Sequence, residues 1–206
     1  MKFEDVKNVK GHCLIEELEF LMEMVGKIPE EHKDKNLIEV GTHRGKSACT
    51  TLLGMQKYNI TGTLCLCDTF KYGCQTGSGA GEERPYKESF TLRDMKFGAD
   101  FLDETKVNIK KFCGDKKVVF FQGYSDDVPT VTIGKTSFIF IDGDHCTHGC
   151  LLDILKYSQV LVKGGIIVLH DYPNKEVTDA MNIFRSIRPE YKKLGEKMGM
   201  GAFVKG

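Results

Sequence analysis

The chain has 206 residues, 41% of them hydrophobic, and Lys plus Arg equals Asp plus Glu at 29 each. This length fits a single domain spanning residues 1–206. The balanced charge provides no basic surface for nucleic acid or an anionic membrane, and no apolar run approaches the roughly 20 residues that cross a bilayer. We therefore expect a cytoplasmic protein whose partner is a small molecule or a neutral polymer.

The eight cysteines favour free thiols over disulfides or a zinc site. Several of them fall inside predicted strands and helices, and no CxxC pair is matched by a second pair. A reducing compartment agrees with this interpretation.

The N-terminal part predicts a helix over about 12–26, a strand over 36–40 and a second helix over 47–58. Gly41 and Gly45 lie between that strand and helix, where the backbone has to approach a ligand closely. The spacing matches neither the GxGxxG of dinucleotide enzymes nor a phosphate-binding P-loop. The loop therefore favours recognition of a nucleoside.

The next strand, 63–67, ends at Asp68, which is placed to accept hydrogen bonds from a ribose or, alternatively, to cap a helix. Residues 71–88 are glycine-rich without periodicity, and we expect a lid that carries acceptor specificity. Helices over 89–101 and 104–112 and a strand over 117–121 follow. Ser125, just beyond that strand, is either an adenine contact or a helix N-cap.

Two short apolar runs, 138–141 and 166–169, stop at polar residues that carry chemistry. The first is followed by Asp142 and His145, and the second by His170 and Asp171. Both runs read as buried parallel strands whose carboxyl ends form a ligand crevice, so these four side chains should meet there. A helix over 151–162, ended by Gly164, connects the two strands.

A helix to about 187 and strands over 191–197 and 201–205 complete the chain. The alternation predicts a doubly wound, Rossmann-like α/β sheet of about seven mostly parallel strands with a C-terminal antiparallel hairpin.

With these elements in order, the chain resembles the class I S-adenosylmethionine (SAM)-dependent methyltransferases. Glu39 to Ser47 is similar to their first motif, and Asp68 to their ribose-binding acid. The paired strand ends resemble the methyltransferase-24 group and the metal-dependent O-methyltransferases of sugars and catechols. The resemblance implies that SAM is bound by Glu39, Gly41, Thr42, Gly45, Ser47, Asp68, Gly123, Ser125 and Asp142.

The resemblance also implies a divalent metal held by Asp142, His170 and Asp171, with His145 as the general base. Oxygen ligands suit Mg²⁺, which would lower the pKa of an acceptor hydroxyl and fix its direction. His170 departs from the family, which carries a carboxylate there. An imidazole would favour Mn²⁺, Fe²⁺ or Zn²⁺, or His170 would act on the substrate proton instead.

We therefore expect a SAM-dependent O-methyltransferase acting on a hydroxyl of a sugar or glycan, with a catechol or phenolic acceptor as the alternative. A nicotinamide-dependent oxidoreductase and a non-catalytic SAM-binding module are the rivals from other classes. The chain is also compatible with a homo-oligomer or with a domain of a larger glycan-synthesising protein.

Overall fold

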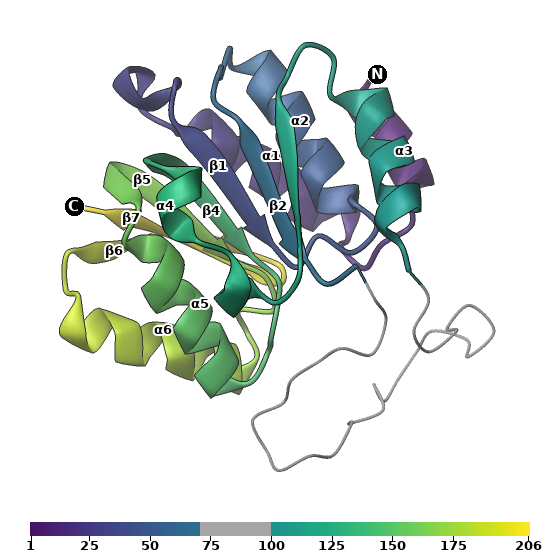
Figure 1. Ribbon diagram of the computed structural model, residues 1–206. Coiled ribbons are helices and arrows are strands. Elements are labelled where there is room, and N and C mark those ends of the chain that lie inside the picture. The colour runs from purple at the N-terminus through teal and green to yellow at the C-terminus, as the bar shows by residue number, and fades with distance from the viewer. Residues whose placement is uncertain (71–99) are drawn as a thin grey trace.

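The computed structural model of the protein describes residues 1–70 and 100–206 and contains a seven-stranded sheet (Figure 1). The strand order is β3-β2-β1-β4-β5-β7-β6; β1 to β5 are parallel, and β7 is antiparallel to both β5 and β6. The predicted doubly wound sheet with a C-terminal hairpin is confirmed. The strands are β1 (Asn36–Val40), β2 (Leu64–Asp68), β3 (Val118–Gln122), β4 (Thr136–Ile141), β5 (Leu161–Leu169), β6 (Tyr191–Lys197) and β7 (Met200–Lys205).

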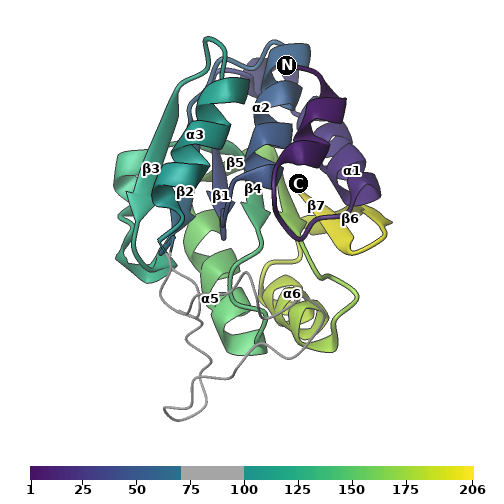
Figure 2. The ribbon, with the colours of Figure 1, turned by 90° about the vertical axis from the view of Figure 1, so that its right-hand side faces the viewer.

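Helices cover both faces of the sheet (Figures 1 and 2). Helices α1 to α3 pack on one face, and α4 to α6 on the other. The helices are α1 (Ile15–Gly26), α2 (Lys46–Lys57), α3 (Leu102–Phe112), α4 (Thr130–Ile133), α5 (Thr147–Ser158) and α6 (Lys175–Ile187), with short 3₁₀ turns η1 (Phe3–Asn8), η2 (Glu30–His32) and η3 (Ser125–Asp127).

The strands contribute to two hydrophobic cores because successive side chains point to opposite faces. Phe138 and Phe140 of β4 pack beneath α1 and α2, whereas Ile139 and Ile141 pack beneath α5 and α6. All four are buried. The apolar runs seen in the sequence therefore reflect burial on both sides, as expected for central parallel strands.

The connection between β4 and β5 differs from its prediction. Helix α5 begins and ends four residues before the expected 151–162, and β5 begins at Leu161 rather than at 166. Gly164 does not end the helix but lies within β5 at a φ of +79°, beside an irregularity in the β4–β5 pairing. Glycine permits this backbone conformation and so lets the strand continue through the irregularity.

The central strands end together at one edge of the sheet, and this placement positions the site. Strand β1 pairs with β2 on one side and β4 on the other, so the chain direction of the crossovers reverses between β1 and β4. Open α/β sheets bind ligands at such a switch point. The predicted lid 71–88 and the predicted helix 89–101 fall on or overlap residues outside the described range.

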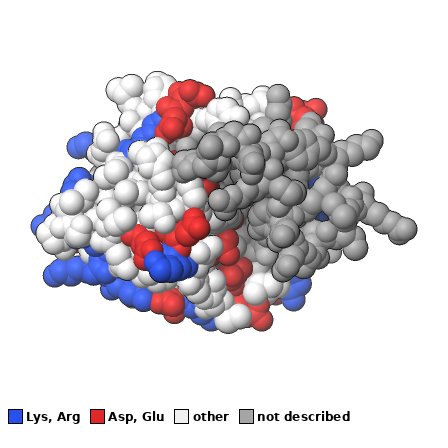
Figure 3. All heavy atoms as spheres, turned by 90° about the horizontal axis from the view of Figure 1, so that it is seen from below, with Lys and Arg blue, Asp and Glu red and all other residues white. Residues whose placement is uncertain are grey.

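The described part of the molecular surface shown in Figure 3 mixes acidic, basic and uncharged side chains. None of the described helices is long and apolar enough to cross a membrane. The cysteines at 13, 49, 65, 67, 113, 146 and 150 are free thiols.

Candidate active site

The ends of β4 and β5 bring the four predicted side chains together. The backbone N–H of His170 donates to the carbonyl of Ile141 at 3.0 Å, and the N–H of Asp142 donates to the carbonyl of Val40 at 2.8 Å. Register between the parallel strands thus places Asp142 and His145 beside His170 and Asp171, as the sequence predicted.

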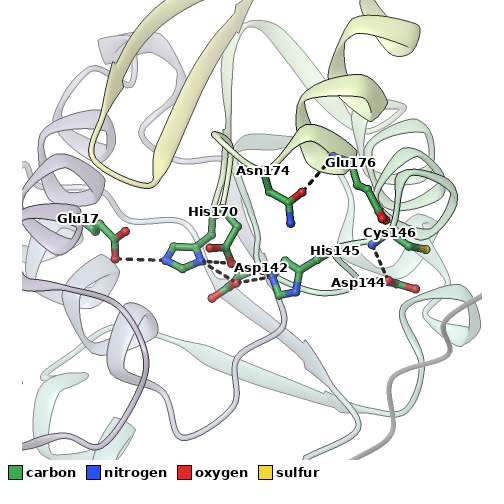
Figure 4. Close-up of polar contacts among 9 residues, drawn as sticks. Glu17, Asp142, Asp144, His145, Cys146, His170, Asn174 and Glu176 are labelled. Atoms are coloured by element: carbon green, nitrogen blue, oxygen red, sulfur yellow. Dashed lines mark hydrogen bonds and ion pairs between the residues drawn. The ribbon is translucent and has the colours of Figure 1, made fainter. Parts of the chain in front are cut away.

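These four side chains form a closed ring of alternating oxygen and nitrogen atoms. Figure 4 labels Asp142, His145 and His170 among them. Nε2 of His145 lies 3.3 Å from Oδ1 of Asp142 and 3.0 Å from Oδ2 of Asp171. Nδ1 of His170 lies 3.1 Å from the same Asp142 oxygen and 2.9 Å from the same Asp171 oxygen. Each carboxylate therefore faces both imidazoles.

The backbone at Asp171 has a φ of +51°, in the left-handed region. Aspartate tolerates this region better than most residues, but non-glycine residues seldom adopt it. Its carbonyl accepts a hydrogen bond from the N–H of Asn174 at 2.8 Å, in the turn that leads into α6. Such strained positions persist where the surrounding structure determines them, and they cluster at functional sites.

In the ring, the negative carboxylates favour positively charged imidazoles, and the imidazoles favour ionised carboxylates. Burial disfavours a charged His145, but the carboxylates of Asp142 and Asp171 outweigh burial and raise the pKa of His145 to about 10. The same carboxylates raise the pKa of His170 against the effect of burial. Hydrogen bonds from the two imidazoles in turn hold the pKa of Asp171 below its usual range. The ring therefore favours ionised carboxylates with positive charge between them.

The geometry of the ring fits a divalent cation. The four donor atoms lie within 4.8 Å of one another. The edges of the ring measure 2.9–3.3 Å, so one cation could contact several of these atoms at the same time. The mixed nitrogen and oxygen donors suit Mn²⁺, Fe²⁺ or Zn²⁺ at least as well as Mg²⁺.

Glu17 of α1 also belongs to this cluster, and sequence reasoning missed it. Its Oε2 lies 3.2 Å from Nε2 of His170, and both side chains are buried. The available signal was its helical spacing with Leu18 and Leu21, which makes it an acid on the apolar face of an amphipathic helix. Buried acids are uncommon unless they are paired.

The glycine loop after β1 packs tightly against the end of β4. Gly41 has a φ of +86°, and a Cβ there would lie 2.0 Å from the carbonyl oxygen of Asp142. Gly45, at a φ of +85°, precedes the first residue of α2. The expected close approach at Gly41 is made to the protein's own backbone, and it ties the loop to the ring through Asp142.

Two buried oxygens of this loop region lack partners among the described residues. The Ser47 hydroxyl donates to Oε1 of Glu39 at 2.9 Å, whereas Oε2 of Glu39 and the Thr42 hydroxyl are unpaired. Burial raises the pKa of Glu39 well above its usual value. Buried polar atoms without partners are rare, and here they mark a place where a ligand could supply hydrogen bonds.

Asp68 lies at the end of β2 beside this loop. Its carboxylate accepts hydrogen bonds from the N–H groups of His43 and Phe70, each at 2.6 Å. Burial raises its pKa. Asp68 caps no described helix. The Thr69 hydroxyl also donates to Oδ1, at 3.4 Å, whereas Oδ2 accepts from His43 alone among the described residues, so the predicted ribose contact remains compatible with this position.

The segment from Gly123 to Ser125 continues the same edge of the sheet. The N–H of Gly123 donates to the carbonyl of Asp68 at 2.9 Å. The Ser125 carbonyl accepts from the Tyr157 hydroxyl at 3.0 Å. Ser125 is the first residue of a 3₁₀ turn rather than its N-cap.

A narrow pocket joins the glycine loop to the ring, and the N-terminal segment forms one wall. Its lining residues are Gly11, His12, Cys13, Gly41, Thr42, His43, Arg44, Lys46, Ser47 and Asp142. The His43 ring packs against the rings of His12 and Phe101, with centroids 5.2 Å and 5.1 Å apart. These aromatic contacts hold the His43 side chain against the protein.

Comparison with known proteins agrees with this architecture. A family model described as a methyltransferase domain, methyltransferase-24, matches residues 38–172. The structure is similar to the O-methyltransferase NovP, with a TM-score of 0.75 and 19% identity over 98% of this chain and 88% of that one. No curated protein sequence matches the chain significantly.

Two further structures share the fold at lower similarity. An O-methyltransferase from Bacillus cereus in complex with SAH has a TM-score of 0.60 and 16% identity, covering 98% of this chain and 90% of that one. CalS11, a TDP-rhamnose 3′-O-methyltransferase of calicheamicin biosynthesis, has a TM-score of 0.58 and 11% identity, covering 98% and 80%.

Proposed function

Because this chain belongs to the methyltransferase-24 family of methyltransferase domains, we propose that it transfers a methyl group from SAM to a hydroxyl of a sugar or glycan with the help of a divalent metal. The observation that carries the proposal is the ring of Asp142, His145, His170 and Asp171, which lies at the strand ends beside the pocket of the glycine loop. Donor and acceptor sites would then share one edge of the sheet.

The donor site is supported by the residues around Gly41. The unpaired oxygens of Glu39 and Thr42 would meet the polar groups of SAM, and Asp68 would accept from its ribose hydroxyls. Gly123 and Ser125 would approach the adenine. The SAH complex of the Bacillus cereus enzyme supports the same use of this fold.

The acceptor chemistry is assigned to the ring. Methyl transfer needs a hydroxyl that is made nucleophilic and held in line with the methyl carbon. Asp142, His170 and Asp171 would hold the metal, which when bound would lower the pKa of that hydroxyl and fix its direction. His145 would act as the base. Its Nε2 faces Asp142 and Asp171 in the ring, so it would be free to accept the hydroxyl proton once the metal takes up those carboxylates.

A sugar acceptor is favoured over a phenolic one for two reasons. The ring carries a histidine at the base position, and the chain contains no tryptophan to form a wall for an aromatic acceptor. CalS11, which has the same fold, acts on TDP-rhamnose.

The two-part division of the site is tested by calorimetric titration with SAM. Asp68→Asn should weaken SAM binding about tenfold, because a charge-assisted hydrogen bond contributes about 1.5–3 kcal/mol. Asp142→Ala and Asp171→Ala should bind SAM nearly as the wild type does but should lose metal-stimulated methyl transfer in a screen of sugar and catechol acceptors. Equal loss of SAM binding in all three variants would contradict the division, and binding of NAD in place of SAM would contradict the function.

A further inference from the structure

His170 lies between two sets of acidic side chains, each facing a different ring nitrogen. Nδ1 faces Asp142 and Asp171 at 3.1 Å and 2.9 Å, and Nε2 faces Glu17 at 3.2 Å (Figure 4). The His170 side chain is 8% exposed and that of Glu17 is 7% exposed. The imidazole therefore connects helix α1 to the ring through a contact largely shielded from water.

The Glu17 carboxylate is itself held in one orientation. Its Oε2 accepts a hydrogen bond from the N–H of Leu14 at 2.7 Å, across the first turn of α1. Its Oε1 lies against the turn between β6 and β7, where a Cβ on Gly199 would come within 2.2 Å of it. Glu17 thus presents Oε2 to His170 from a fixed position.

A carboxylate accepts hydrogen bonds and donates none, so Nε2 of His170 has to carry the proton in this contact. The other nitrogen, Nδ1, faces the carboxylate oxygens of Asp142 and Asp171, which favour a second proton there when no metal is bound. A metal among these three atoms would replace that proton and bind the lone pair of Nδ1. Metal-binding histidines commonly donate their second N–H to a carboxylate in this way.

We propose that Glu17 is a positioning residue that fixes the Nε2–H tautomer of His170, so that Nδ1 is a ligand of the metal held by Asp142 and Asp171. This inference rests on the metal-assisted part of the proposed function. It assigns to a residue of the N-terminal helix a role in metal affinity, although that residue lies outside the ring. It also explains how a histidine serves where similar enzymes use a carboxylate.

A second grouping has to be distinguished from this one. Cys13, Glu17 and His170 also have donor atoms within 4.8 Å of one another. A metal on that side of the imidazole would bind Nε2 and use Glu17 as a direct ligand. The two arrangements differ in their dependence on Asp171, which belongs only to the ring.

The test is titration of the metal-free full chain with Mn²⁺ alone, followed by calorimetry and by electron paramagnetic resonance. Glu17→Ala should weaken Mn²⁺ binding about 10- to 100-fold, as loss of an outer partner typically does. Glu17→Gln, whose carbonyl still accepts from Nε2–H, should stay within about threefold of the wild type. Glu16→Ala is the matched control, because Glu16 is an exposed acid in the same turn of α1 and should leave the affinity unchanged.

Three results would overturn the inference: no Mn²⁺ binding by the wild type, wild-type affinity in Glu17→Ala, or Mn²⁺ binding that survives Asp171→Asn. SAM titration of the same preparations separates these outcomes from failure of the methyltransferase assignment, since SAM binding does not depend on Glu17 in this scheme.

Nitrogen NMR of the imidazoles provides a readout that does not depend on the fold of a variant. In the wild type loaded with Zn²⁺, which is diamagnetic, the His170 signals should show a protonated Nε2 and a metal-bound Nδ1. The reverse assignment, or a doubly protonated ring in the presence of Zn²⁺, would overturn the inference.

Discussion

Asp142 contacts the glycine loop with its backbone and the histidines of the ring with its side chain. Its backbone carbonyl lies where a side chain on residue 41 would be, and its carboxylate faces both histidines of the ring. The position of the glycine loop relative to the ring is therefore set largely by one residue. This places the proposed methyl donor and the proposed acceptor at a defined separation.

His145 allows the acid–base proposal to be tested at the level of one side chain. His145→Gln should lower kcat for methyl transfer by about 10²- to 10⁴-fold, since a positioned base contributes about that factor. SAM affinity should change by less than about twofold, because His145 does not line the loop pocket. The measurement is steady-state turnover with an acceptor found in the screen, alongside SAM titration.

His148 is the control for this substitution, as it is exposed at the start of α5, one helical turn beyond His145. His148→Gln should leave turnover unchanged. If the turnover of His145→Gln stayed within a few-fold of the wild type, His145 would not be the general base.

Single residues also show where the sequence was informative and where it was not. Asp142, His145, His170 and Asp171 could be expected to meet because each lies within four residues of the end of β4 or β5, and ligands bind at the carboxyl ends of such strands. The contact between Glu17 and His170 joins positions far apart in the chain through the packing of α1 on the sheet. No local pattern encodes that packing angle, so the partner of His170 emerged only from the structure.

At the scale of elements, the junction between the loop after β1 and the end of β4 combines a positive φ with close backbone contact. The strand pattern predicted both strands and the glycine loop between β1 and α2. It did not predict that the 11–13 segment covers this loop or that His43 packs against Phe101, because both depend on contacts between distant parts of the chain. Boundaries were least predictable where Gly164 continues β5 instead of ending a helix.

Gly41→Ala should destabilise the protein by at least about 2 kcal/mol, because a left-handed residue with a Cβ costs about 1–2 kcal/mol and the Cβ would also meet the Asp142 carbonyl at 2.0 Å. It should also abolish detectable SAM binding. Urea unfolding and SAM titration measure the two effects.

Gly114→Ala is the matched control, with a φ of +55° and only the Gln56 side chain at 3.4 Å. It should lose about 1 kcal/mol through backbone strain alone and keep SAM affinity. Equal destabilisation by both substitutions would show that the contact between the loop and Asp142 is unimportant.

At the scale of the whole molecule, helices cover both faces of the sheet, and some ionisable side chains between the layers are buried. Burial changes the pKa of such a group. Asp153 of α5 is buried, and burial raises its pKa from 3.8 to about 6. In the unfolded chain the pKa of Asp153 is 3.8, so burial of its carboxyl group costs no extra free energy below that pH. As the pH rises through about 6, the folded protein loses this stability because the carboxyl group has to ionise while buried.

Asp153→Asn should therefore gain stability relative to the wild type as the pH rises from 4 to 7. The gain should approach 3 kcal/mol, since each unit of pKa shift corresponds to about 1.4 kcal/mol. Urea unfolding of both proteins across this range measures it. A stability difference that does not change with pH would show that Asp153 ionises normally in the folded protein.

The segment that matches the family model, 38–172, contains the ring but begins after α1, where Glu17 lies. The proposed tuning of His170 would therefore come from a helix that lies outside this segment but packs into the same core as β4. A chimera that carries the first helix of NovP on this sheet should keep the shape of the donor pocket and yet shift in its choice between hard and soft cations. Members of the family would then differ in the metal they bind because of residues that precede the segment 38–172.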